Sequence, residues 1–284
     1  MQPRFSTPIL LTAFNRPDNA ARVFDEIRKI RPKQLFWAVD GPRKDRPGED
    51  ALCKKTQDII KRVDWECEVK TLFRTENLGC GYAVAKAIDW FFENVEEGII
   101  FEDDDLPDPT FFRFCQELLE YYRDDRRIMH ISGDNFQHGK KRGDASYYFS
   151  RYTHIWGWAT WRRAWKYYDY KYISRTTYDK AWLRSVHDQK GLAVLPNVNL
   201  VSNIGYGGDS THTSGDSPFS DMPTQPMQFP LIHPKKIKRD VMADFLTYKE
   251  VFDGSLGKLL FTGSLRFIPK PVKSYVKKMI NKNK

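Results

Sequence analysis

The chain has 284 residues, a formal charge of +9 and four cysteines. Its length allows a sizeable core, either in one large domain or in one domain with an appendage. No stretch approaches the roughly 20 apolar residues that cross a bilayer, and Met1–Ser6 has no apolar signal-peptide core. The cysteines form no CxxC pair and no metal-ligand spacing, which suits a reducing compartment. We therefore expect a cytoplasmic protein rather than a membrane-spanning or disulfide-stapled one.

The positive charge is concentrated at the C-terminal end. After Asp253 the chain has eight basic residues and no acidic one, so residues 1–253 carry only one of the nine net charges. Within 265–284, Val272 and Met279 fall on one helical face among lysines. Basic amphipathic helices lie on anionic membranes, so we expect 255–284 to be a basic amphipathic tail that contacts the inner face of the plasma membrane. A disordered, solubilising tail is the alternative, and the nearly neutral remainder argues against a nucleic-acid partner.

Apolar runs and turn residues alternate regularly in the first half of the chain. Strands are expected at 8–14, 34–39, 67–73 and 98–101, and helices after Pro17, at 50–63, after Gly79 and from about Asp108. This alternation predicts an α/β fold with a parallel sheet of the nucleotide-binding type.

The pattern changes beyond about residue 130. Residues 128–131 form another expected strand, whereas the aromatic segment Trp156–Trp161 is expected to be loop-rich. A helix is predicted over 177–189 and a short strand over 192–195. The sequence has no internal repeat, and no obvious linker separates the two parts of the chain.

Four acidic residues, Glu102–Asp105, follow the apolar run Gly98–Phe101. In parallel α/β sheets, ligands bind at the carboxyl ends of the strands. Adjacent carboxylates repel one another by roughly 1 kcal/mol per pair at 4 Å in water, so we expect a cation to neutralise them. Hard oxygen ligands favour Mg²⁺ or Mn²⁺, which bind substrate phosphates as well as carboxylates. The alternative is a solvated acidic turn that caps the helix beginning near Asp108.

Several segments carry a family resemblance in a fixed order. They are Phe101–Asp104, Ile131–Asn135, Trp156–Arg162, Asn203–Gly207 and Asp209–Thr213. Together they resemble a bacterial group of nucleotide-diphospho-sugar transferases of the GT-A glycosyltransferase fold, and the acidic run with Pro109–Phe112 resembles N-acetylglucosaminyltransferase I. The resemblance spans roughly residues 7–235. It implies a Rossmann-like, mostly parallel central sheet flanked by helices, in a domain at 1–254 with a nucleotide-sugar donor half at about 7–133 and an aromatic-rich acceptor half at 134–254.

The resemblance also implies how the acidic run works. In this fold the acidic motif holds a divalent cation that bridges the two phosphates of a sugar nucleotide. It implies Asp104 as the direct ligand of Mn²⁺ or Mg²⁺, and places Glu102 near the ribose or the hydrated metal. The additional Asp105 leaves a second register open, with Asp103 and Asp105 as ligands. His212, in a polar loop bordered by glycines, is a further candidate because imidazole binds Mn²⁺; an ordinary surface histidine is the alternative.

Arg16 and Asp40 follow the first and second expected strands. The resemblance implies that Arg16 contacts the nucleotide and that Asp40 reads the base. A carboxylate accepts the imide N–H of uracil, which favours a UDP donor. Their alternatives are a surface arginine and a turn aspartate. Arg74 and Asn77 precede the glycine-opened helix, whose N-terminus can bind a diphosphate, although a plain strand-to-helix connection explains this segment almost as well.

An inverting transferase needs a base that takes the proton of the acceptor hydroxyl. The base often follows a Trp-Gly-Trp-like segment in this fold, but Ala159 and Thr160 offer no carboxylate here. Asp179 is the first candidate, in a segment that resembles an element of the bacterial group, and Asp134 and Asp209 follow it. A helix N-cap is the alternative role of Asp179.

The expected function is a metal-dependent, inverting hexosyl- or N-acetylhexosaminyltransferase that uses a UDP-sugar and a glycan or lipid-linked acceptor in surface polysaccharide synthesis. Two other classes stay open. A nucleotidyltransferase that makes a sugar nucleotide would ordinarily have a glycine-rich, basic phosphate loop, which Leu11–Pro17 is not. The other class is a non-catalytic nucleotide- or glycan-binding protein.

Overall fold

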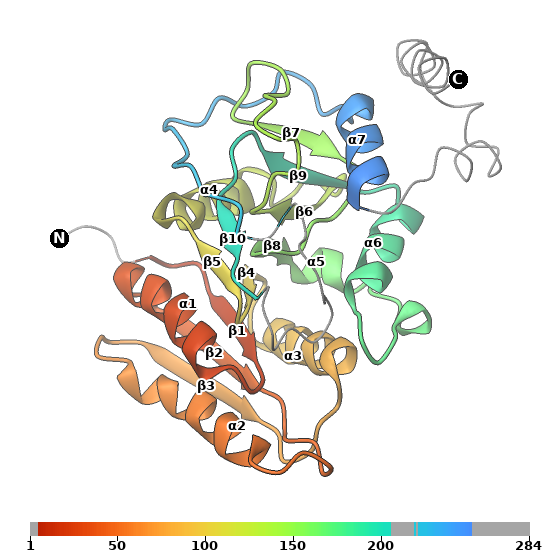
Figure 1. Cartoon of the computed structure of the whole chain (residues 1–284). Helices are drawn as coiled ribbons and strands as arrows, with labels where there is room; N and C mark the ends of the chain where they lie inside the picture. Colours follow the sequence, from red (N-terminus) through yellow and green to blue (C-terminus); the bar gives the residue numbers. More distant parts are fainter. Residues whose placement is uncertain (1–4, 206–218, 220, 252–284) are drawn as a thin grey trace.

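A computed structural model of the chain describes residues 5–205, 219 and 221–251 (Figure 1). Its centre is an eight-stranded sheet with the strand order β3-β2-β1-β4-β8-β6-β9-β7. A separate two-stranded sheet pairs β5 with β10 in antiparallel fashion. The strands are β1 (Ile9–Ala13), β2 (Gln34–Val39), β3 (Glu68–Phe73), β4 (Glu97–Glu102), β5 (Asp105–Pro107), β6 (Ile128–Ser132), β7 (Tyr147–Ser150), β8 (Trp158–Trp161), β9 (Leu192–Pro196) and β10 (Val201–Asn203).

The large sheet is parallel in its first half and mixed in its second. β1 lies between β2 and β4 and is parallel to both, and β3 is parallel to β2. β8 is antiparallel to both of its neighbours, β4 and β6, whereas β9 is parallel to β6 and antiparallel to β7. Parallel pairings therefore outnumber antiparallel ones by four to three. The expected α/β fold with a mostly parallel central sheet is confirmed.

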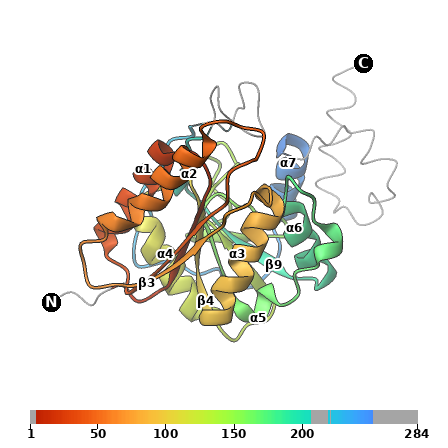
Figure 2. The ribbon, with the colours of Figure 1, turned by 90° about the horizontal axis from the view of Figure 1, so that it is seen from below.

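Helices cover both faces of the sheet, as Figure 2 shows from one end. The helices are α1 (Pro17–Ile30), α2 (Glu49–Asp58), α3 (Cys80–Asn94), α4 (Pro109–Tyr121), α5 (Arg162–Trp165), α6 (Asp179–Asp188) and α7 (Val241–Val251), with short 3₁₀ turns η1 (Ile59–Arg62) and η2 (Tyr170–Tyr172). Residues of α1, η1 and α4 share one apolar cluster with the sheet, and residues of α3, α5 and α6 share another on the opposite face. The sheet is thus buried on both sides, which explains why its first strands are continuous apolar runs.

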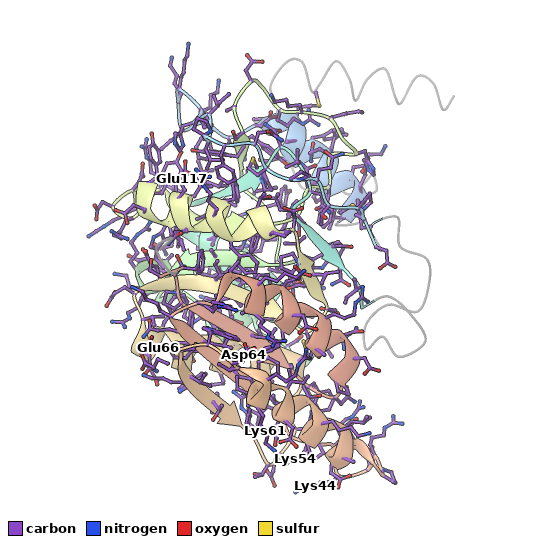
Figure 3. All side chains as sticks on the ribbon, turned by 90° about the vertical axis from the view of Figure 1, so that its left-hand side faces the viewer. Lys44, Lys54, Lys61, Asp64, Glu66 and Glu117 are labelled. Atoms are coloured by element: carbon purple, nitrogen blue, oxygen red, sulfur yellow. The ribbon has the colours of Figure 1, made fainter. Side chains whose placement is uncertain are left out.

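Local signals place the first-half helices where the sequence predicts them. Pro17 occupies the first turn of α1, and Val23 and Ile27 bury its apolar stripe. The side chain of Asp108 accepts a hydrogen bond from Thr110 N at 2.8 Å and caps α4. Outside the core, Lys54 and Lys61 both approach Asp58 Oδ1, at 3.1 and 2.9 Å. The two lysines are labelled in Figure 3. Such exposed pairs contribute little to stability.

The prediction that the Trp156–Trp161 segment is loop-rich was wrong for its last four residues, which form β8. All four are buried, and side chains from the two faces enter different clusters: Trp158 belongs to the cluster that includes residues of α3, α5 and α6, whereas Trp161 belongs to the one that includes residues of α1 and α4. A strand buried on both faces has no polar–apolar alternation, so its period of two is invisible in the sequence.

The described helices include none with both the length and the apolar character needed to span a membrane. The expected tail at 255–284, with its membrane contact at 265–284, and the domain boundary after residue 254 lie outside the described residues, as do Asp209 and His212.

His130 is a fully buried histidine in β6. Its Nε2 lies 2.7 Å from the carbonyl oxygen of His154, and Trp182 Nε1 donates to its Nδ1 at 3.0 Å. A neutral ring that donates through Nε2 and accepts at Nδ1 satisfies both contacts. Burial lowers the pKa of His130 to about 3.

We expect this histidine to make the fold sensitive to acid. The unfolded chain takes up a proton as the pH falls through 6.5, whereas the folded chain resists until about 3, so stability is lost as the pH falls below 6.5. At pH 5 the loss from this group is about 2 kcal/mol. Urea unfolding at pH 7.5 and 5.0 should show that His130→Gln and His130→Asn each shrink the stability difference between the two pH values by that amount. An unchanged difference in both variants would contradict the prediction.

Candidate active site

A cavity of about 700 Å³ opens at the carboxyl ends of β1, β2 and β4. Cavities of this size hold small-molecule ligands. Of the residues expected from the sequence, it brings together Arg16, Asp40, Arg74, Asn77, Glu102, Asp103, Asp104, Asp105 and Asp179. Asp134 is fully buried and is not part of the wall.

Arg16, directly before α1, faces the acidic turn. Its guanidinium forms an ion pair with Asp103 and a second one with Asp104, whose Oδ2 lies 3.0 Å from Nη1. Burial by itself would lower the pKa of Arg16, but the combined effect of Asp103 and Asp104 is larger, so the pKa is raised. From the sequence, Arg16 is expected to contact the nucleotide; its contact with the acids is visible only in the structure.

The single charge of Arg16 does not neutralise the carboxylates of Glu102, Asp103 and Asp104. Burial, reinforced by the charge of Asp104, raises the pKa of Glu102 to about 8. Burial also raises the pKa of Asp103 to about 6, although Arg16 opposes this shift. The Tyr178 hydroxyl donates to Glu102 Oε1 at 3.1 Å. The turn therefore concentrates negative charge that the neighbouring protein groups only partly offset.

Asp105 differs from the other acids because its carboxylate points into the protein. It is 1% exposed, and its Oδ2 accepts hydrogen bonds from Glu102 N at 3.0 Å and from Gly157 N at 2.9 Å. Burial raises its pKa well above the usual range. These contacts give Asp105 a structural task, joining the acidic turn to the segment before β8.

Gly205 follows β10 and approaches the acidic turn closely. A Cβ atom at this position would lie 2.0 Å from Asp104 Oδ2 and 2.9 Å from Arg16 Nη1. Asn203 Oδ1 holds the glycine by accepting from its N–H at 2.9 Å. Only a residue without a side chain allows the Asp104 carboxylate to lie this close to the backbone.

The chemistry of the donor set fits Mg²⁺ or Mn²⁺. Glu102, Asp103 and Asp104 supply hard oxygen atoms at one edge of the cavity. Within 5–205, 219 and 221–251, no three His, Cys, Asp or Glu side chains are grouped so that they form a complete metal site by themselves. Mg²⁺ sites commonly have one or two carboxylates, with phosphate oxygens and water as the other ligands, and this donor set matches that pattern.

Asp40 holds the loop that precedes α3. Its Oδ2 accepts from Asn77 Nδ2 at 3.0 Å and from Gly79 N at 3.3 Å, and both oxygens accept from Leu78 N, at 3.1 and 3.2 Å. Burial raises the pKa of Asp40, and these backbone N–H groups oppose the shift. Arg74 also lines the cavity, and burial lowers its pKa. Asp40, Arg74 and Asn77 are therefore brought together, as expected.

The 174–180 segment, before and into α6, crosses the N-terminus of α3. The carbonyl oxygen of Arg175 accepts a hydrogen bond from Gly81 N at 3.0 Å, so a protein group already occupies part of the helix end. This contact weakens the suggestion that the N-terminus of α3 binds a diphosphate. Asp179 is the first residue of α6, which follows Tyr178 as the N-cap, and its side chain lines the cavity.

The sequence analysis did not single out Arg175 or Tyr178 as site residues. Both lie in the cavity wall, and Tyr178 contacts Glu102. Their position within the four residues before Asp179 was the available signal, because a segment that places one side chain at a cavity brings nearby residues there as well.

No family model matches the chain, and no curated protein matches it. The chain is similar in structure to TarS 1–349 of S. aureus, with 10% identity, a TM-score of 0.45 and 69% of this chain covered; it spans 58% of that protein's length. HddC from Yersinia pseudotuberculosis has 11% sequence identity and a TM-score of 0.42, with 72% of this chain and 96% of that protein covered. Mouse xyloside xylosyltransferase 1 has 10% sequence identity and a TM-score of 0.37, with 65% of this chain and 82% of that protein covered. These likenesses are too weak to carry a conclusion about function.

Proposed function

We propose that this protein is a metal-dependent, inverting glycosyltransferase that moves a hexosyl or N-acetylhexosaminyl group from a UDP-sugar to a glycan or lipid-linked acceptor. The observation that carries the proposal is the convergence of Glu102, Asp103 and Asp104 with Asp40 and Asp179 in one cavity at the carboxyl ends of the parallel strands. Nucleotide ligands bind at this edge in open α/β sheets.

In the proposed reaction, Asp104 would hold the Mn²⁺ or Mg²⁺ ion, and Glu102 and Asp103 would lie beside it. Such an ion neutralises the diphosphate leaving group. Because Asp105 is committed to two backbone N–H groups, we favour the register with Asp104 over the one with Asp105. Arg16, which pairs with Asp103 and Asp104, is proposed to contact the nucleotide through its guanidinium group.

Asp40 is the proposed acceptor for the imide N–H of uracil. Its Oδ1 accepts from Leu78 N at 3.2 Å, and a carboxylate oxygen has two lone pairs with which to accept hydrogen bonds. Asn77, through its bond to Asp40 Oδ2, keeps the carboxylate in place.

Asp179 is the proposed base. It takes the proton of the acceptor hydroxyl while that oxygen forms its bond to the anomeric carbon and the bond from this carbon to the diphosphate oxygen breaks. Asp134 is too buried for this role. The proposed lipid-linked acceptor is supported by the basic character of the sequence at 265–284. The proposed setting in surface polysaccharide synthesis rests on the family resemblance of the sequence.

The proposal is tested by following UDP release from UDP-glucose, UDP-galactose and their N-acetylamino forms in Mn²⁺, with and without saccharide acceptors. Metal-dependent release from one donor is expected. In parallel, UTP and sugar 1-phosphates are tested for pyrophosphate release, which would instead show a nucleotidyltransferase. Absence of both activities, and of UDP binding by calorimetry, would favour a non-catalytic glycan-binding protein.

A further inference from the structure

A buried acid that the proposed reaction does not use holds the segment between β7 and β8. Asp134 is fully buried, and its Oδ1 lies 2.6 Å from His154 Nδ1. Its other oxygen accepts a hydrogen bond from Trp156 N at 3.3 Å. One carboxylate therefore fixes a side chain and a backbone N–H two residues apart, and so sets the course of the chain at Trp156.

Asp105 fixes the same segment one residue further on. Its Oδ2 accepts from Gly157 N, and the same atom accepts from Glu102 N. The backbone of Trp156 and Gly157 is thus attached to Asp134 on one side and to the acidic turn on the other. A buried carboxylate needs such partners to offset its loss of hydration.

The ring of Trp156 is supported as well as its backbone. Phe136 packs edge-to-face against Trp156, with ring centroids 5.0 Å apart, and its ring stacks on His154 at 4.6 Å. His154 Nε2 has no hydrogen-bond partner within the described ranges, so the His154 ring is oriented by Asp134 through Nδ1 and by this stacking. Asp134, His154 and Phe136 therefore form a connected support behind Trp156.

The three tryptophans of this region have different surroundings. Trp158 and Trp161 are buried in the core, whereas Trp156 is partly exposed and lines the cavity that holds the acidic turn. The face of an indole ring carries partial negative charge, which attracts the polarised C–H groups on the face of a sugar ring. A large rigid ring with two side-chain torsions also loses little entropy when it makes such a contact.

We propose that Trp156 is a stacking platform for a pyranose ring, and that Asp134 and Asp105 are positioning residues that place it. The inference rests on the proposed function for its substrate class, a sugar beside the donor diphosphate. The ring belongs either to the donor sugar or to the acceptor, and the chemistry of the contact is the same.

The test uses the full-length protein with its eight tryptophans replaced by 5-fluorotryptophan, so that the ¹⁹F spectrum reports on each tryptophan position. Trp156→Phe assigns the signal of residue 156. UDP-glucose and UDP-N-acetylglucosamine are added with Mn²⁺, UDP alone serves as the comparison, and maltose and chitobiose represent acceptors. We expect a sugar-bearing probe to shift the Trp156 signal, while the signal of Trp90, assigned by Trp90→Phe, stays in place.

Calorimetry then separates the two possible sources of the ring. If the ring of the donor sugar stacks on Trp156, Trp156→Ala is expected to weaken binding of the UDP-sugar about tenfold relative to binding of UDP. If the ring of the acceptor stacks there, the variant is expected to weaken saccharide binding while UDP and the UDP-sugar bind normally. Either result supports the platform. Unchanged binding of every sugar-bearing probe, with no shift of the Trp156 signal, would overturn it.

The positioning role has its own readout. Asp134→Asn and Phe136→Leu are expected to move the Trp156 signal and to weaken sugar binding, with UDP binding unchanged; two variants are used in case one of them does not fold. A merely structural role would lower the melting temperature and weaken UDP binding and sugar binding alike. If the parent protein fails to bind UDP at all, the proposed function fails, while a shift of the Trp156 signal by maltose or chitobiose would still support the platform.

Discussion

Replacing Asp104 by alanine is expected to weaken Mn²⁺-dependent UDP binding by about 100-fold, since the loss of a metal ligand should cost at least as much as the loss of a residue that supports one. Asp104 has its carboxylate at the cavity edge, close against the backbone of Gly205. Calorimetry with UDP, with and without Mn²⁺, provides the measurement. The parent protein should bind UDP more tightly in the presence of the metal, and the variant should lose that difference.

Two further variants make this result specific. Asp50→Ala removes an exposed acid of α2 outside the cavity and should leave binding unchanged. Asp105→Ala leaves the N–H groups of Glu102 and Gly157 without their acceptor, at about 1–3 kcal/mol for each buried group, so its main effect should be lower stability. Equal, metal-dependent binding by the parent and by Asp104→Ala would rule out Asp104 as the ligand.

Gly81→Ala is expected to destabilise the protein even though alanine is the better helix former. In a free helix this change gains about 1 kcal/mol. Here the new Cβ would lie 2.0 Å from the carbonyl oxygen of Ser174 and 3.0 Å from that of Thr177. Backbone atoms cannot rotate away as side chains do, so the 174–180 segment must shift. We expect a net loss of about 1–3 kcal/mol, as in other overpacked sites.

Urea unfolding measures this loss, and UDP-sugar turnover measures its effect on the site. Because the same segment carries Tyr178 and Asp179 into the cavity, turnover should fall together with stability. Glu93→Ala, at an exposed position of the same helix, is the matched control and should leave both quantities nearly unchanged. A Gly81→Ala protein more stable than the parent would show that the segment does not lie against α3 in solution.

The first half of the fold was predictable from the sequence because its signals are local. Alternating apolar runs and turn residues mark β1 to β4 and their helices, and Asp40 and the acidic run each follow a strand directly. In a parallel sheet, residues after neighbouring strands meet at one edge. Their convergence in one cavity needed no information about distant contacts.

The second half depends on contacts that the sequence does not display. β8 is a strand because it fills the gap between β4 and β6, and the bond between Asp134 and His154 joins residues on separate segments. The roles of the acids illustrate this limit. Asp105 and Asp104 are neighbours of the same type, yet Asp105 accepts hydrogen bonds from two backbone N–H groups whereas Asp104 pairs with Arg16. Only the surrounding chain distinguishes them.

The antiparallel insertion of β8 bears on how this protein can be divided. β8 comes from the second half of the chain but hydrogen-bonds to β4 of the first half. A fragment ending at residue 133 would retain β4 and β6 without the strand that lies between them, and would expose their unpaired N–H and C=O groups. Open edges of this kind recruit strands from other molecules. The first half of the chain is therefore not a separable module, and attempts to produce it alone, or to exchange it between proteins at that point, should yield aggregates.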